Sequence, residues 1–233
     1  MAEQNQAKRK LRKKDHWDWF FGLTFGLGFQ FIWWSLCTVF VAWMIEVIGM
    51  SYFWGPEHSR EVLQAEMSYL GDFNRNLLTG LNPTEMAGLF GRWINNAVNF
   101  LHLRDIATAL GRAGGHSVGD YVSQGIEILI NTLFIFAVRL TICISAATGF
   151  VLVGVVAFID GLVERDIRRA CGGIESAMIY HRSKRLIAPL TMLSFGLYMT
   201  LPFSVHPTLV FLPIMTVVGY MIFMTVKSFK KYL

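Results

Sequence analysis

The chain has 233 residues, of which 54% are hydrophobic, 14% are aromatic and only 16% are charged. A soluble domain carries closer to a quarter charged residues, so this chain lacks the polar surface that a water-soluble fold needs. Disorder is excluded by the apolar content, and three cysteines make no disulfide framework. The net charge of +5 comes from bases clustered beside apolar runs, which indicates an integral membrane protein.

A basic tail precedes the first apolar run. Residues 1–18 hold six Lys and Arg residues against three acids, which is typical of a cytoplasmic segment on an anionic membrane surface. No charged residue occurs from Trp19 to Ile45, a stretch longer than a helix needs to cross hydrocarbon. The run ends without a small-residue cleavage pattern, so we expect an uncleaved transmembrane helix over residues 19–47.

The next segment, residues 48–122, is expected to be helical and extracytoplasmic. Residues 51–122 carry seven acids and five bases, a depletion of positive charge that places them outside the cytoplasm. Asn82, Pro83 and Glu85 predict a helix start with a capping box. The helix after it has an apolar face over residues 86–101, either packed on a partner helix or lying on the outer leaflet. Since its polar face holds a single base, packing is favoured.

A second span is predicted over residues 123–159, with its first part extending outward from the bilayer. Between Ile128 and Ile159 the only charged residue is Arg139, which we place at the outer interface. Glu46, at the outer end of the first span, is expected at a similar depth. Because an ionisable group at that depth pairs or snorkels to water, the sequence predicts a structural ion pair between Glu46 and Arg139.

The loop of residues 160–185 holds six bases and four acids, so the positive-inside rule places it in the cytoplasm. The spacing of Glu164 and Arg168 predicts that the preceding helix continues to about Ala170. No nucleophile with a partner and no metal-ligand spacing is evident, so no catalytic, cofactor or metal residues are expected. The residues expected to contact a partner are Glu164, Arg165, Asp166, Arg168, Arg169, Glu175, Tyr180, His181 and Arg182.

Two further uncharged runs, residues 186–202 and 208–226, predict a third and a fourth span joined by a proline-containing turn. Residues 227–233 form a basic end. The sequence therefore predicts an all-α, polytopic membrane protein with about four transmembrane helices and both termini in the cytoplasm. A helical extracytoplasmic segment separates the first two spans.

Residues 160–185 also carry a family resemblance. The residues concerned are the ERDIRR motif at 164–169, Gly172-Gly173, Glu175-Ser176 and Tyr180-His181-Arg182. With the basic tail and the long second span, they resemble the integrating conjugative element membrane proteins, a bacterial family of unknown biochemical function. The resemblance implies an inner-membrane accessory of conjugation, encoded among DNA-transfer genes near the coupling ATPase of a type IV secretion system. It supplies no catalytic residues.

The sequence is compatible with three classes of function. A non-enzymatic protein that binds other membrane proteins of a conjugation apparatus, with the coupling ATPase as one candidate, is favoured. A small transporter or channel, or a subunit of one, is the alternative; an intramembrane enzyme would need several polar groups at membrane depth, where only Arg139 stands. Contact with membrane lipids is expected and direct nucleic-acid contact is not, while homo-oligomerisation stays open.

Overall fold

The computed structural model describes residues 16–72, 80, 82–113, 118–171 and 177–229. Every regular element in these ranges is helical, which confirms the predicted all-α fold. The helices are α2 (His16–Tyr52), α3 (His58–Tyr69), the 3₁₀ turn η1 (Leu70–Asp72), α4 (Pro83–Phe100), α5 (Leu103–Ala113), α6 (Val118–Ala170), α7 (Ala177–Thr200) and α8 (Pro207–Lys227). The chain divides into two compact units, residues 1–40 and residues 41–233.

The longest element, α6, is a single helix of 53 residues. At 1.5 Å per residue it is about 80 Å long, more than twice the hydrocarbon thickness of a bilayer. The helix is therefore long enough for the expected extension beyond a bilayer, and it begins at Val118 rather than at residue 123. Its end at Ala170 agrees with the prediction drawn from Glu164 and Arg168.

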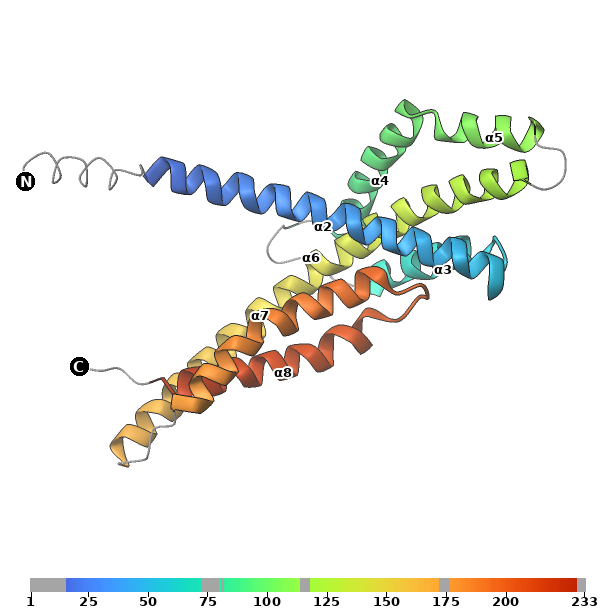
Figure 1. Cartoon of the computed structure of the whole chain (residues 1–233). Helices are drawn as coiled ribbons and strands as arrows, with labels where there is room; N and C mark the ends of the chain where they lie inside the picture. The colour runs from blue at the N-terminus through green and yellow to red at the C-terminus, as the bar shows by residue number, and fades with distance from the viewer. Residues whose placement is uncertain (1–15, 73–79, 81, 114–117, 172–176, 230–233) are drawn as a thin grey trace, which may run out of the picture. The chain divides into compact units, whose positions relative to one another are not determined.

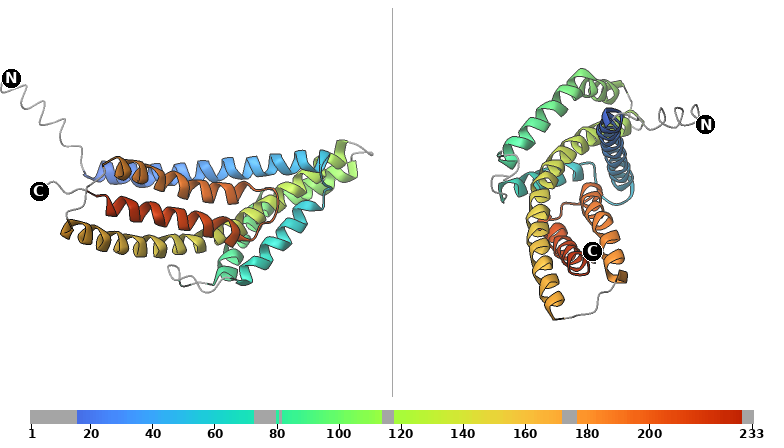
Figure 2. Two further views of the ribbon diagram at one scale, coloured as in Figure 1. Left: turned by 90° about the horizontal axis from the view of Figure 1, so that it is seen from below. Right: turned by 90° about the vertical axis from the view of Figure 1, so that its left-hand side faces the viewer.

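Within residues 41–233, α6 is the element on which the others pack. The helices α3, α4 and α5 contact α6, and α8 packs against both α6 and α7. Figures 1 and 2 show α7 and α8 running beside the second half of α6, while α4 and α5 lie along its first half. Buried side chains of α6, α7 and α8 form the core where these groups of helices meet, among them Ile142, Tyr198 and Phe211.

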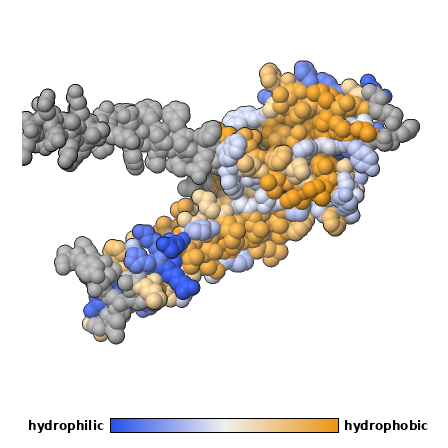
Figure 3. Space-filling model, in the orientation of Figure 1, coloured by the Kyte–Doolittle hydropathy of each residue, from blue (hydrophilic) through white to orange (hydrophobic). Residues whose placement is uncertain are grey.

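Three helical segments are long and apolar enough to cross a membrane: Ile32–Tyr52 within α2, the whole of α6, and α8. Many apolar side chains on α6, α7 and α8 are exposed, as Figure 3 shows along these helices. The predicted third span, 186–202, corresponds to α7, which begins at Ala177 and ends at Thr200. The first turns of α7 carry Arg182, Lys184 and Arg185, so this helix combines a charged start with an apolar remainder.

The start of α4 shows how local sequence sets a helix boundary. Asn82 precedes the helix, Pro83 is its first residue, and the backbone N–H of Asn82 donates to the Glu85 carboxylate at 3.4 Å. This is the predicted capping box. Proline fits the first helical position because a backbone N–H there would have no intrahelical acceptor, and proline has no N–H. Upstream, Gly80 adopts a φ of 67°, a left-handed conformation that glycine adopts without steric cost.

Candidate functional site

A buried ionic cluster joins three helices of residues 41–233. Arg139, on α6, and Glu66, on α3, have side chains that are 2% and 0% exposed. The Nε and Nη2 of Arg139 donate to the same Glu66 oxygen, Oε1, at 3.0 and 2.8 Å. The hydroxyl of Tyr198, on α7, donates to the other oxygen at 2.6 Å. The carboxylate is therefore held by two elements at once.

The remaining donors of Arg139 bind main-chain carbonyls at the C-terminal end of α7 and just after it. Nη1 donates to the carbonyls of Met199 and Leu201, and Nη2 donates to that of Phe203. The last carbonyls of a helix have no intrahelical donor, so a guanidinium with five N–H groups satisfies them here. Arg139 thus fastens the turn between α7 and α8 to the middle of α6, which is a structural role.

The predicted ion pair between Glu46 and Arg139 is wrong, because Arg139 pairs with Glu66. The Glu46 carboxylate instead accepts a hydrogen bond from Trp54 Nε1 at 3.1 Å and lies 3.2 Å from His58 Nδ1. The chain turns after Tyr52, which brings Trp54 and His58 back to Glu46, and α3 then carries Glu66 to Arg139. Each group has a partner, as its burial requires, but the partner comes from the segment between the two spans.

Glu66 and Tyr198 were not predicted as members of this site. A signal for Glu66 is present in the sequence, because it lies three residues after Leu63 and four before Leu70, within the apolar stripe of that helix. An acid in an apolar stripe needs a buried partner. Tyr198 has no such signal, since a tyrosine in an uncharged span is ordinary.

The described residues among those predicted to contact a partner lie at the C-terminal end of α6 and the N-terminal end of α7, close to the C-terminal end of α8. We call this surface the charged end (residues 160–171, 177–185 and 227–229). Glu164 forms an ion pair with Lys227 of α8 at 2.8 Å, and Arg165 lies 3.3 Å from its neighbour Asp166. Of the residues predicted to contact a partner, Glu164, Arg165 and Asp166 thus form ion pairs within the chain.

The other predicted contact residues differ in exposure. Arg169, His181 and Arg182 are exposed, so they are free to meet another molecule. The Tyr180 ring packs on Phe229 and lies under the Lys184 ammonium, and Arg168 is half-buried. Glu175 falls outside the described residues. The structure therefore gathers the predicted residues at one end of the helices without forming a catalytic arrangement from them.

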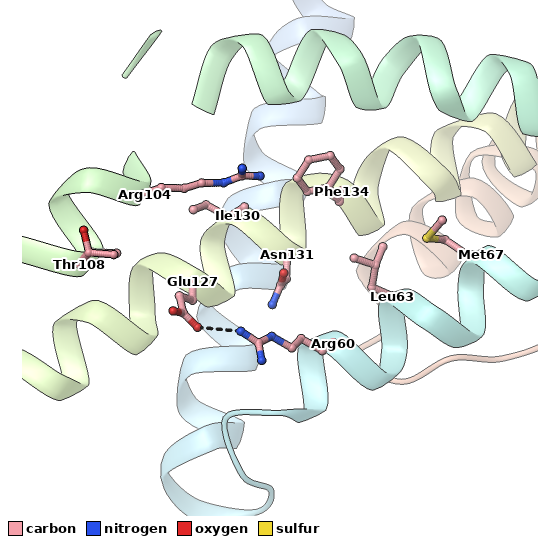
Figure 4. Close-up of a pocket in the computed structure, with 10 residues that line it drawn as sticks. Arg60, Leu63, Met67, Arg104, Thr108, Glu127, Ile130, Asn131 and Phe134 are labelled. Atoms are coloured by element: carbon pink, nitrogen blue, oxygen red, sulfur yellow. Dashed lines mark hydrogen bonds and ion pairs between the residues drawn. The ribbon is translucent and has the colours of Figure 1, made fainter. Parts of the chain in front are cut away.

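A groove of about 580 Å³ lies at the other end, between α3, α5 and α6 (Figure 4). Its apolar lining residues are Leu63, Met67, Ala107, Ile130 and Phe134. At its edge, Arg60 and Glu127 form an ion pair at 3.3 Å, and Arg104 donates to Asn95 at 3.2 Å. An apolar floor with a polar edge suits an apolar helix better than a polar small molecule.

Among the residues that the structure describes, no group of three His, Cys, Asp or Glu side chains is placed to hold a metal ion. His58 and His102 each lie beside a single carboxylate, Glu46 and Asp105 respectively.

Comparison with known proteins supplies the family. Residues 52–230, more than three quarters of the chain, match the family model described as "IncC plasmid conjugative DNA transfer protein DtrJ-like". No curated protein and no solved structure matches the chain. The match confirms the resemblance to a conjugative-transfer family that the charged loop suggested. The chain belongs to the DtrJ-like family of conjugative DNA transfer proteins.

Proposed function

We propose that this protein is a non-enzymatic accessory of a conjugative DNA-transfer apparatus, embedded in the bacterial inner membrane and bound to the coupling ATPase or to channel proteins of a type IV secretion system. The family match supports the role in conjugation. The three apolar helices support a position in the membrane. With α7 as a further span, both termini and the charged end face the cytoplasm, in keeping with the distribution of bases.

The observation that carries the binding role is a set of exposed apolar side chains on α4 and α5. Trp93 and Phe100 of α4 are 68% and 83% exposed, and Leu89 of α4, Leu101 in the turn between the helices and Ile106 of α5 are also exposed. Met86 and Val98, on the same helix, are buried instead. The predicted apolar face is therefore divided: one part packs within the chain and the other is left uncovered. Contiguous exposed apolar surface outside a bilayer marks a contact with another protein.

The alternative, a small transporter or channel, is less well supported. A transport path requires ionisable groups that are free to bind an ion or substrate at membrane depth. The charged residues within the predicted spans are Glu46, Glu127 and Arg139, and the two acids are engaged by Trp54 with His58 and by Arg60 respectively. The donors of Arg139 are bound to Glu66 and to main-chain carbonyls. Its contacts are those of a structural group.

The experiment is an affinity purification of the full chain from conjugating cells after brief cross-linking, with co-purifying proteins identified by mass spectrometry. We expect near-stoichiometric recovery of the coupling ATPase or channel proteins. Recovery of this protein alone, as a monomer or closed oligomer, would contradict the proposal and favour transport.

Two test variants and one control show on which side of the membrane the partner binds. Trp93→Ala/Phe100→Ala should abolish recovery of a partner bound outside the cytoplasm, while Tyr52→Ala/Phe53→Ala, which removes two equally exposed aromatic rings elsewhere, should not. Arg169→Glu/Arg182→Glu should abolish recovery of a cytoplasmic partner. Unchanged recovery with both the α4 and the charged-end variants would count against both surfaces.

A further inference from the structure

A cavity of about 340 Å³ opens between α6, α7 and α8 at the charged end. Much of its apolar lining comes from Phe158 of α6, Tyr180 of α7 and Phe229, which follows the end of α8. Two cations, Arg165 and Lys184, also line it. The cavity thus places positive charge beside apolar surface, and three different helices build it.

The two cations are incompletely neutralised by the protein. Among the residues that the structure describes, Arg165 forms hydrogen bonds with the carboxylate of the adjacent Asp166 alone, at 3.3 and 3.4 Å, and the Asp166 side chain is 67% exposed. Lys184 lies 5.8 Å from the centre of the Tyr180 ring, and in the described ranges no carboxylate pairs with it. Both cations therefore remain available to an anion.

A third cation reinforces this charge. Arg168 follows Arg165 by three residues, so the two lie on the same face of α6. Gly161, four residues before Arg165, is also on this face and lies close to Val226 of α8. Its Nε and Nη2 atoms are enclosed, yet neither donates to an acceptor in the described part of the chain. Buried guanidinium donors normally have acceptors, so Arg168 adds positive charge on the same helix face that is not neutralised by a hydrogen-bond acceptor, although Arg168 is not one of the residues that line the cavity.

We propose that this cavity, lined by Arg165 and Lys184, binds an anionic phospholipid. The phosphate accepts hydrogen bonds from Arg165 and Lys184, and part of an acyl chain occupies the apolar lining. Figure 3 shows apolar surface along the helices giving way to hydrophilic surface at this end, as at the headgroup level of a bilayer. Basic pockets between membrane helices are known sites for acidic lipid headgroups. The site is independent of any contact with the coupling ATPase.

The test measures lipid retention by the full chain. The protein is purified in mild detergent, incubated with phosphatidylglycerol or phosphatidylcholine, and examined by native mass spectrometry. We expect the wild-type chain to retain phosphatidylglycerol preferentially. Arg165→Gln/Lys184→Gln should weaken that retention by about 30-fold, roughly fivefold for each charge removed. Arg60→Gln/Arg104→Gln, with the same loss of charge at the other groove, should retain it unchanged.

Further measurements distinguish lipid binding from binding of other anions, and a loss of binding from misfolding. Millimolar inorganic phosphate should not displace phosphatidylglycerol; displacement would identify a soluble phosphate ligand and overturn the proposal. Lys184→Gln alone, at an exposed side chain, should fold normally and lose about fivefold. Arg165→Lys/Lys184→Arg should restore binding. Equal retention of the two lipids by the wild type, or equal phosphatidylglycerol retention by wild type and the Gln variants, would also overturn it.

Discussion

Glu66 and Arg139 are 73 residues apart in sequence, yet their side chains form one of the most enclosed contacts described in the chain, at 2.8 Å. The pair connects α3, which follows the first predicted span, to the middle of α6. Through Tyr198 and the carbonyls after α7, it also connects the α7–α8 hairpin. A single ionic cluster thus attaches the segment between the first two predicted spans to α6 and to the hairpin of α7 and α8.

Removing one member of this pair should destabilise the protein strongly. Glu66→Gln or Arg139→Gln leaves a buried charge without its counterion, which costs about 3–5 kcal/mol in free energy of unfolding. The double variant should cost less than the sum of the two. Unfolding curves in detergent measure the coupling.

The matched control for that cycle is Arg60 with Glu127, an ion pair at 3.3 Å whose side chains are 54% and 57% exposed. Its coupling should stay within about 1 kcal/mol, because water screens exposed charges. Additive effects at Glu66 and Arg139 would show that the buried contact is not a stabilising unit.

Tyr198→Phe isolates one hydrogen bond of the cluster. The substitution keeps the ring, which lies 5.1 Å from Phe211, and removes the hydroxyl that donates to Glu66. Because the lost bond is to a charged acceptor, we expect a loss of about 1.5–3 kcal/mol in unfolding free energy. Tyr220→Phe, at an exposed ring, should be neutral in the same measurement. Equal stability of the two variants would contradict a structural role for the hydroxyl.

Two glycines control how closely α6 and α8 pack. A Cβ at Gly161 would lie 2.7 Å from Val226 Cβ, and one at Gly219 would lie 2.7 Å from Val153 Cγ1. Alanine at either position should therefore force the helices apart and lower the unfolding free energy by about 1–3 kcal/mol.

Gly154→Ala is the control within the same interface, since its Cβ would meet Ile222 at an ordinary 3.5 Å. Thermal unfolding of the three variants in one detergent compares them directly. If Gly154→Ala is as harmful as Gly161→Ala, close approach is not the cause.

The native cysteines test the proposed orientation. Cys171, at the charged end, is exposed, while Cys143 is buried. In a Cys37→Ser background, a membrane-impermeant maleimide should label Cys171 only after the inner membrane is permeabilised, and Cys143 only after denaturation. Ser68→Cys, on the exposed surface of α3, should be labelled without permeabilisation. Labelling of Cys171 in intact cells exposing the periplasmic face would reverse the topology.

Helix positions were largely predictable because their determinants are local. The uncharged runs predicted α2, α6 and α8, the spacing of Glu164 and Arg168 predicted where α6 ends, and Asn82 with Glu85 predicted where α4 starts. The start of α7 at Ala177, nine residues before the predicted span, was harder to predict. Hydropathy marks where a helix enters hydrocarbon, whereas the helix itself continues through the charged residues before it.

The sequence by itself determined that the chain is all-helical, that it has helices able to cross a membrane, and that its charged loop resembles conjugative-transfer proteins. Composition, periodicity and short motifs carry that information. Only the tertiary structure decided that Arg139 pairs with Glu66 while Glu46 is held by Trp54 and His58. Both acids satisfy the requirement for a partner at that depth, and the choice depends on how α3 folds back onto α6, a long-range packing that no local pattern encodes.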